Sequence, residues 1–330
     1  MWALLGVAVQ FAPWPPEWAD AVYHGAILPV WSQVTSRVVS AVPGSFTAAL
    51  VLLALVALVA VVVWPGGRRR VGRALGWLVA SLLVAFPLTF GLGYHTSAPE
   101  AALAAAQPAD YEYAREEVLA ALLGAAPTGR PAAGGAATVT QLASCLSETT
   151  RELRGGSVRL PYRVKAVPEG SLLRFGFAGF VVPWLLEPHV DSGLPTAALT
   201  GVALHELAHS AGYAREAEAE AVALLAGLSC EVSGVTYAAA LRAAAALAAR
   251  LPSAERAAYV DFWPESAVED LRQAAEAAAS YRAAGLAGLA ARAYDAYLLS
   301  QGTEAGIGDY DRATDILVRL LARRREAAAL

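Results

Sequence analysis

Charged side chains are scarce in this sequence: they make up 16% of its 330 residues, whereas soluble globular domains average about a quarter. Cysteine is nearly absent, with two residues, which excludes a disulfide-rich scaffold. The formal net charge is −4, so the chain lacks the basic face that a nucleic-acid partner requires. Apolar residues reach 57%, which excludes intrinsic disorder. The composition predicts an alanine-rich, mainly α-helical protein that places part of its length in lipid.

Two long uncharged runs predict membrane helices. Phe46 to Trp64 contains no charge, proline or glycine, and at about 1.5 Å per residue it nearly spans the hydrocarbon core of a bilayer, about 30 Å. Ala74 to Gly93 is the second run, with Pro87 near its end, where a membrane helix tolerates a kink. The apolar stretch at 2–12 is short, and we interpret it as a short first membrane helix.

The segment between the two long runs carries four arginines, namely Arg68, Arg69, Arg70 and Arg73. Short loops rich in lysine or arginine stay in the cytoplasm. We therefore expect residues 1–95 to form a membrane domain and residues 96–330 to form a domain outside the cytoplasm.

The outer domain reads as helical with a small extended region. Helices are expected over Glu112 to Ala125, over Thr138 to Leu153, and from Thr196 almost to the end of the chain. Ser157 to Val167 predicts an edge strand, and Phe175 to Val190 predicts an extended strand near a cleft. The expected fold is therefore a helical domain with a small edge strand or sheet beside the helix that follows.

That helix contains the pattern His–Glu–x–x–His. His205 and His209 are four residues apart, so they lie one above the other on a helix face and can bind one zinc ion. Glu206 can then act as the general base for a water molecule that the metal activates. The alternative, a surface helix with solvated histidines, is disfavoured because apolar residues surround the motif.

Zinc needs a third protein ligand, and the chain turns back after Gly212 into an acidic segment. Glu216 and Glu220 are four residues apart and share a helix face. We assign Glu216 as the ligand and Glu220 as the acceptor for the second ring nitrogen of a ligand histidine. Glu218 is the alternative third ligand, which makes the set gluzincin-like with either glutamate.

The segment from Phe175 to Leu225 resembles a family of bacterial membrane-anchored HExxH proteins that are zinc-metallopeptidase-like and form a domain of unknown function. The similarity continues at 23–29, 42–46, 295–298 and 306–310, and so covers nearly the whole chain. It implies three N-terminal membrane helices in a bacterial inner or cell membrane and an outward-facing zincin-like domain. The chain departs from the family pattern at Glu220 and Tyr294, where the family tends to have asparagine.

Three further features are candidates for function. Tyr310, in a glycine-bounded stretch, is a candidate donor to the oxyanion of a tetrahedral intermediate, with a capping or core tyrosine as the alternative. Val181 to Leu186 is a candidate strand along which a substrate peptide adds, with a purely structural strand as the alternative. Cys145 and Cys230 would face an oxidising compartment, which permits a disulfide, although the sequence does not give their separation.

These observations predict a membrane-anchored zinc metalloprotease that hydrolyses peptide bonds of a peptide or protein substrate. A catalytically inactive or structural zinc-binding membrane adaptor or sensor is the alternative, and a closed fourth coordination position would favour it. An intramembrane protease would need the motif helix to lie in lipid, but charged residues flank that helix too closely.

Overall fold

The computed structural model describes all residues except 1, 64–67, 130–138, 157, 304–309 and 330. The fold is mainly helical, as the sequence predicts, with one small sheet. The N-terminal helical elements are α1 (Trp2–Gln10), α2 (Pro16–Ala19), η1 (Asp20–Ile27), α3 (Leu28–Ala41), α4 (Phe46–Val63), α5 (Arg68–Thr89) and η2 (Gly91–His95). The remaining elements are α6 (Pro108–Gly129), α7 (Val139–Arg154), β1 (Lys165–Val167), η3 (Leu173–Phe175), β2 (Gly179–Val182), β3 (Glu187–Asp191), α8 (Thr196–Ser210), α9 (Glu216–Leu228), α10 (Ser233–Ala249), α11 (Ser253–Val260), α12 (Glu265–Tyr281), α13 (Ala284–Ser300) and α14 (Tyr310–Ala328).

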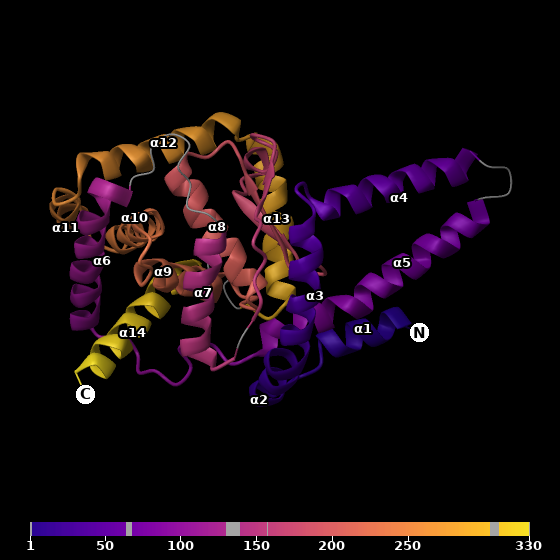
Figure 1. Ribbon diagram of the computed structural model, residues 1–330, viewed down its shortest axis with the longest axis horizontal. Coiled ribbons are helices and arrows are strands. Elements are labelled where there is room, and N and C mark those ends of the chain that lie inside the picture. Colours follow the sequence, from indigo (N-terminus) through magenta and orange to yellow (C-terminus); the bar gives the residue numbers. More distant parts are fainter. Residues whose placement is uncertain (1, 64–67, 130–138, 157, 304–309, 330) are drawn as a thin grey trace.

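Helices α4 and α5 project from the rest of the molecule as a long hairpin, and α1 packs along the part of α5 nearest the body (Figure 1). Within the described residues, one helical segment, Gly72–Thr89, is both long enough and apolar enough to cross a membrane, and 11% of this segment is buried. There is a second candidate span if two consecutive helical segments, Pro16–Ala41 and Phe46–Val59, are counted together. The chain bends by 78° at the break between them. Apolar side chains on α4 face outward all round, which is unusual for a helix in water.

The body of the molecule contains an alanine-rich helical core. Helices α8, α9 and α10 lie at its centre, with α6, α7 and α14 packed around them (Figure 1). Small side chains allow these helices to approach closely: a Cβ atom on Gly227 of α9 would overlap the Cβ atom of Ala239 on α10. The core thus holds α8, which carries the histidine motif, in a rigid setting.

The sheet has the strand order β1–β3–β2, with β1 parallel and β2 antiparallel to β3. His189 at the centre of β3 faces Lys165 on one side and Phe180 on the other. Within the described part of the strand expected at 157–167, only Lys165–Val167 is a strand. Pro161 cannot donate to a ladder, and the backbone N–H groups of Arg159 and Tyr162 donate to serine side chains of α3 instead. The single extended segment expected over 175–190 is two strands joined by a turn, in which Leu186 adopts a left-handed φ of 50°.

Several predicted boundaries agree with the structure and others need correction. The helix expected at 112–125 lies within α6, and the helix expected at 138–153 agrees with α7 from Val139 on, since Thr138 lies outside the described residues. The second apolar run is helical from Arg68 and not from Ala74, and its last residues form η2. The segment 14–45, for which the sequence predicts no particular element, is largely helical and forms α2, η1 and α3.

A disulfide joins Cys145 on α7 to Cys230, just beyond the end of α9, with their Cα atoms 5.4 Å apart. It closes a loop with a sequence separation of 85 residues. The pairing that the sequence left open is therefore present in the structure.

Candidate metal centre

The two motif histidines lie on the same face of α8, one helical turn apart. The rings of His205 and His209 are edge to face, with centroids 4.8 Å apart. The chain turns at Gly212, whose φ of 93° is a left-handed value that favours glycine, and α9 begins four residues later at Glu216. This short turn delivers the first carboxylate of α9 to the histidines.

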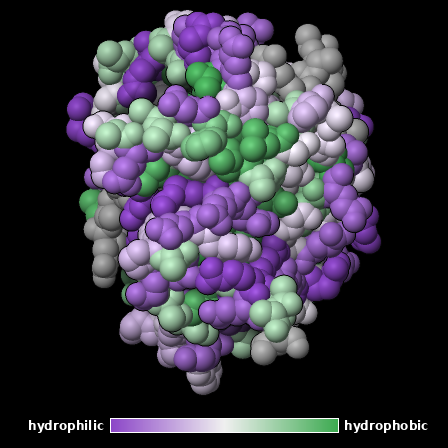
Figure 2. All heavy atoms as spheres, turned by 90° about the vertical axis from the view of Figure 1, so that its left-hand side faces the viewer, coloured by the Kyte–Doolittle hydropathy of each residue, from purple (hydrophilic) through white to green (hydrophobic). Residues whose placement is uncertain are grey.

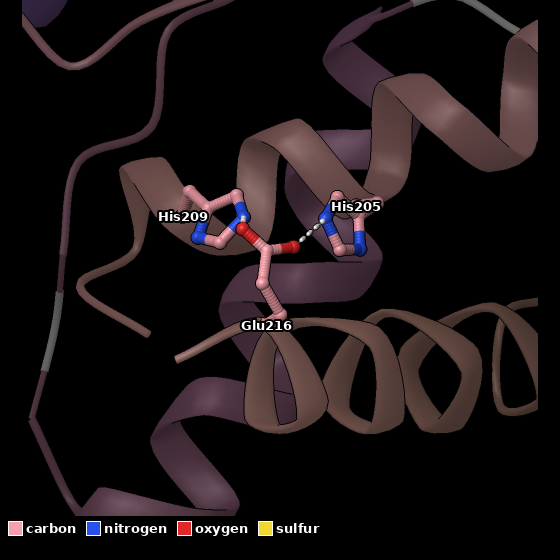
Figure 3. Close-up of side chains that lie close together, drawn as sticks. All are labelled: His205, His209 and Glu216. Carbon is pink, nitrogen blue, oxygen red and sulfur yellow. Dashed lines mark hydrogen bonds and ion pairs between the residues drawn. The ribbon is translucent and has the colours of Figure 1, made fainter. Parts of the chain in front are cut away.

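Figure 3 shows the carboxylate of Glu216 between the two imidazole rings. Its Oε2 atom lies 3.2 Å from Nε2 of His205, and its Oε1 atom lies 3.5 Å from Nε2 of His209. One potential ligand atom from each of the three residues falls within 4.8 Å of the others, and all three residues are buried. The three side chains that the sequence singled out are therefore brought together in a group that could hold a metal ion.

The second nitrogen of each ring is already engaged away from this centre. Nδ1 of His205 lies 2.8 Å from Oε2 of Glu220, whose carboxylate also accepts hydrogen bonds of 2.9 and 2.7 Å from Arg242. Nδ1 of His209 lies 2.7 Å from the carbonyl oxygen of Tyr213. These contacts fix the ring orientations, so both Nε2 atoms point to the same position, as in metal-binding histidines.

The cluster stabilises positive charge. Burial alone would lower the pKa of His205, but its hydrogen bonds with Glu216 and Glu220 outweigh this effect and raise the pKa to about 10. Burial alone would likewise raise the pKa of Glu216, but His209 and His205 hold it well below its ordinary value. The carboxylates therefore favour a cation, a proton or a metal ion, beside the rings.

Glu206 lies beside this centre in a cavity of about 180 Å³, which His205, His209 and Glu216 also line. Burial raises the pKa of Glu206 to about 7, although the neighbouring histidines lower it. Its Oε2 atom is buried and has no hydrogen-bond partner among the described residues. A buried polar atom of this kind is costly unless a ligand or water satisfies it, so the cavity is suited to a polar guest.

The cavity depends on a glycine in β2. A Cβ atom on Gly179 would lie 2.6 Å from Oε1 of Glu206 and 2.7 Å from the carbonyl oxygen of His189. Only glycine allows β2 and the motif helix to approach this closely. The sequence shows this glycine next to the aromatic segment, but nothing local indicates which side chain it faces.

The other candidate residues are placed as follows. Glu218 is buried and pairs with Arg215, so Glu216, not Glu218, lies between the histidines. Tyr310 is the first residue of α14, but its side chain lies outside the described part of the chain, and its expected role stays a prediction. The sequence analysis missed the tyrosine that does reach the cluster: the hydroxyl of Tyr294 on α13 donates a hydrogen bond to Glu216.

The candidate substrate strand is shorter than expected. Strand β2 ends at Val182, and the rest of the expected segment forms the turn into β3. Within the described residues, β2 pairs with β3 alone, so β2 is an edge strand whose other side has no partner strand. Gly179, Phe180 and Val181 of this strand line the cavity.

The comparisons with known proteins give a family and no function. No curated protein matches the chain, and no solved structure matches it. A family model described as a protein of unknown function (DUF3810) matches residues 23–318. This match covers most of the sequence, including the predicted membrane hairpin, the motif helix and α13. The chain therefore belongs to the DUF3810 family.

Proposed function

We propose that the protein is a membrane-anchored zinc metallopeptidase with its catalytic body outside the cytoplasm. The observation that carries the proposal is the convergence of His205, His209 and Glu216 beside the buried carboxylate of Glu206. Two imidazoles and one carboxylate are the ligand set of many catalytic zinc sites, in which the fourth position is kept for water or substrate.

The donor set suits zinc better than a harder cation. Imidazole nitrogens favour zinc and related transition metals, whereas magnesium and calcium prefer oxygen ligands. Both Nδ1 atoms are occupied, by Glu220 and by the carbonyl oxygen of Tyr213, which leaves the two Nε2 atoms for a metal. The carboxylates of Glu216 and Glu220 beside His205 also favour a positive charge there, which supports the proposal.

A bound zinc ion would polarise a peptide carbonyl and acidify a water molecule. Glu206 lines the cavity and would accept a proton from water there and pass it to the leaving amine. Tyr294 lines the same cavity, and its hydroxyl, which donates to Glu216 in this structure, would turn from that carboxylate to donate a hydrogen bond to the oxygen on which negative charge develops. Tyr294 is thus a second candidate for the role expected of Tyr310.

The adaptor alternative requires a closed site with four protein ligands. Among the described residues, three ligand residues meet, and the cavity occupies the side next to Glu206. An intramembrane protease is disfavoured as well, because α8 packs in the body against α9, α10 and β3 and not in the projecting hairpin.

Three observations support the proposed location. Helix α5 contains a segment suited to cross a membrane, and Arg68 to Arg70 begin it at the end of the hairpin far from the body (Figure 1). Loops of this charge stay in the cytoplasm, which would place the body on the opposite side. The disulfide between Cys145 and Cys230 fits an oxidising compartment.

The test compares the purified full-length protein with Glu206→Gln on a mixed library of unstructured peptides in the presence of zinc. The proposal predicts cleavage by the wild type and a loss of at least about a hundredfold in the variant, because general-base catalysis contributes about 10²–10⁴-fold. Equal metal content in both proteins shows that the change removed only the base. Identical product patterns from the two proteins would contradict the proposal.

A further inference from the structure

The metal residues lie next to the body end of the membrane hairpin. Phe90 directly follows α5, and its ring centroid lies 6.2 Å from that of His209. Tyr94 on η2 lines the same cavity, and its carbonyl oxygen accepts a hydrogen bond of 2.6 Å from Arg215, the residue before α9. If α5 crosses a bilayer, the centre is therefore within about one helical turn of its outer surface.

Helix α3 buries a face of mixed polarity and exposes several apolar side chains. Its buried residues are the small polar Ser32, Thr35, Ser36 and Ser40 together with Leu28 and Val39. Two of them are fixed by the segment before β1: the Oγ atom of Ser32 accepts from the backbone N–H of Arg159, and that of Ser40 accepts from the backbone N–H of Tyr162.

The outward face of α3 carries valines at a spacing of four residues. Val30, Val34 and Val38 are 65%, 47% and 39% exposed. Gln33 and Arg37 are exposed beside this stripe. A row of exposed valines flanked by polar side chains, on a helix whose buried face is mostly polar, fits a helix that lies in a membrane interface.

The arrangement of the helices indicates that the outward face of α3 contacts the bilayer. The helical pair Pro16–Ala41 and Phe46–Val59 is bent by 78°, so α3 runs almost across the axis of α4. Figure 1 shows α3 at the base of the hairpin. If α4 crosses the membrane, α3 would therefore lie along the surface of the bilayer. The face of the body turned away from the hairpin carries many hydrophilic residues around a smaller hydrophobic patch (Figure 2).

The cavity beside the metal residues is walled by apolar groups. Phe90, Phe177, Phe180 and Val181 line it, and the last two belong to β2, whose outer edge is outside the sheet. An extended peptide can add to such an edge, and apolar side chains of that peptide would fill the cavity. Tryptophan and tyrosine are enriched where a transmembrane segment leaves the bilayer, and such side chains suit an aromatic cavity.

We propose that the substrate is a polypeptide anchored in the same membrane and cut within a few residues of the bilayer surface. The inference rests on the proposed peptidase function and adds to it the class of substrate. The metal centre is too close to the end of α5, and the body too closely seated through α3, for the cleaved segment to lie far from the membrane.

The test uses the full-length protein with zinc in phospholipid vesicles. A pool of unstructured segments of random sequence is fused to one membrane helix in two ways. In the membrane-adjacent pool, the segment begins about 5 residues from the bilayer, a reach of about 17 Å. In the displaced pool, a folded domain is inserted between the membrane helix and the segment. We expect the membrane-adjacent pool to be cut at least about tenfold faster than the displaced pool, because only the former can reach the centre. The same pool without a membrane helix, in detergent, measures the basal peptidase activity.

Matched variants separate membrane seating from catalysis. Val34→Asp places a charge on the outward face of α3, and Val268→Asp makes the same change on α12, where Val268 is 43% exposed. We expect Val34→Asp to reduce the preference for the membrane-adjacent pool and Val268→Asp to retain it, with equal basal activity in detergent.

The outcomes distinguish this inference from the function on which it rests. Equal cleavage of the two anchored pools, each faster than with Glu206→Gln, would overturn the substrate class and leave the peptidase intact. No cleavage of any pool beyond that of Glu206→Gln would overturn both. An unchanged preference in Val34→Asp would overturn the seating of α3 on the bilayer.

Discussion

The carboxylate of Glu187 on β3 accepts a hydrogen bond of 2.7 Å from the backbone N–H of Phe46, the first residue of α4. Its other oxygen accepts from the N–H and the hydroxyl of Thr47. Ser45 satisfies the next N–H of the helix, that of Ala48, and contacts His189 at 2.9 Å. The sheet beside the metal centre thus caps the first turn of the proposed membrane helix, where a negative charge is favourable.

Replacing this carboxylate should loosen the junction. Glu187→Gln removes the negative charge and turns an amide N–H₂ group, itself a donor, toward one of the backbone N–H donors at this half-buried helix end, while the side chain stays fully buried. We expect a loss of about 1–3 kcal/mol in the free energy of unfolding. Thermal unfolding in detergent measures it, with Glu276→Gln, at an exposed ion pair on α12, as the matched control. Equal melting temperatures for the two variants would show that the cap contributes nothing.

Glu220 should act on the metal through His205. It accepts from Nδ1 of His205 and is itself held by Arg242, so Glu220→Gln weakens the orientation of the ring without removing a ligand. We expect zinc affinity to fall about 10–100-fold. Competition with a zinc chelator gives the affinity, and Glu276→Gln again serves as the control. An unchanged affinity would mean that the ring is held by packing alone.

Gly179 should be required for activity. A methyl group there collides with the carboxylate of Glu206 and the backbone of β3, so Gly179→Ala displaces the proposed base. We expect peptide cleavage to fall at least about tenfold with zinc content retained. Gly285→Ala, on α13 with nothing within 4 Å of the added carbon, is the control and should behave as wild type. Full activity in Gly179→Ala would place Glu206 elsewhere in the working enzyme.

The disulfide should stabilise the body. Removing it in the double variant Cys145→Ser, Cys230→Ser releases a loop with a sequence separation of 85, and we expect a cost of about 2–5 kcal/mol. Denaturant unfolding with and without a reductant measures the cost, and the reductant should have no effect on the double variant. Free thiols in protein taken from the outer side of the membrane would contradict the proposed compartment.

The hydrogen bonds of Asp191 lead us to expect that the free energy of unfolding decreases at acid pH. Burial alone would raise its pKa, but hydrogen bonds from the backbone N–H groups of Gly193, Leu172, Leu173 and Gly170 together lower it. The contribution of this carboxylate is therefore complete above pH about 4, the ordinary pKa of an aspartate, and is lost as the pH falls toward the lowered value.

Unfolding measured from pH 7 down to pH 2 tests this dependence. Asp191→Asn should be less stable than wild type at pH 7 and lose less stability on acidification, whereas Asp261→Asn, at an exposed position, should follow the wild type. Parallel curves for wild type and Asp191→Asn would show that the four N–H groups do not favour the charged form.

The sequence predicts those features of the site that depend on residues close together in the chain. His205 and His209 are one helical turn apart by geometry alone, and Glu216 reaches them because Gly212 turns the chain only a few residues later. Mainly helical structure was predictable as well, because alanine-rich periodic stretches dominate residues 96–330. The family resemblance was confirmed at the level of a family of unknown function.

The remainder depends on contacts between distant segments. Tyr294 and Arg242 come from α13 and α10, and Phe90 from the end of the hairpin; no local pattern distinguishes them from core residues. Helix α3 was not predicted because polar and apolar residues occur on both its buried and its exposed face, which leaves no clear amphipathic pattern.

The most direct test of the account is the zinc content of the purified full-length protein, measured by mass spectrometry of the metal after dialysis. We predict about one zinc ion per chain in the wild type and in Glu218→Gln, and far less in His205→Ala, His209→Ala and Glu216→Ala, since a catalytic site needs all three ligands. Wild-type protein without zinc, or the same zinc content in all five proteins, would contradict the account.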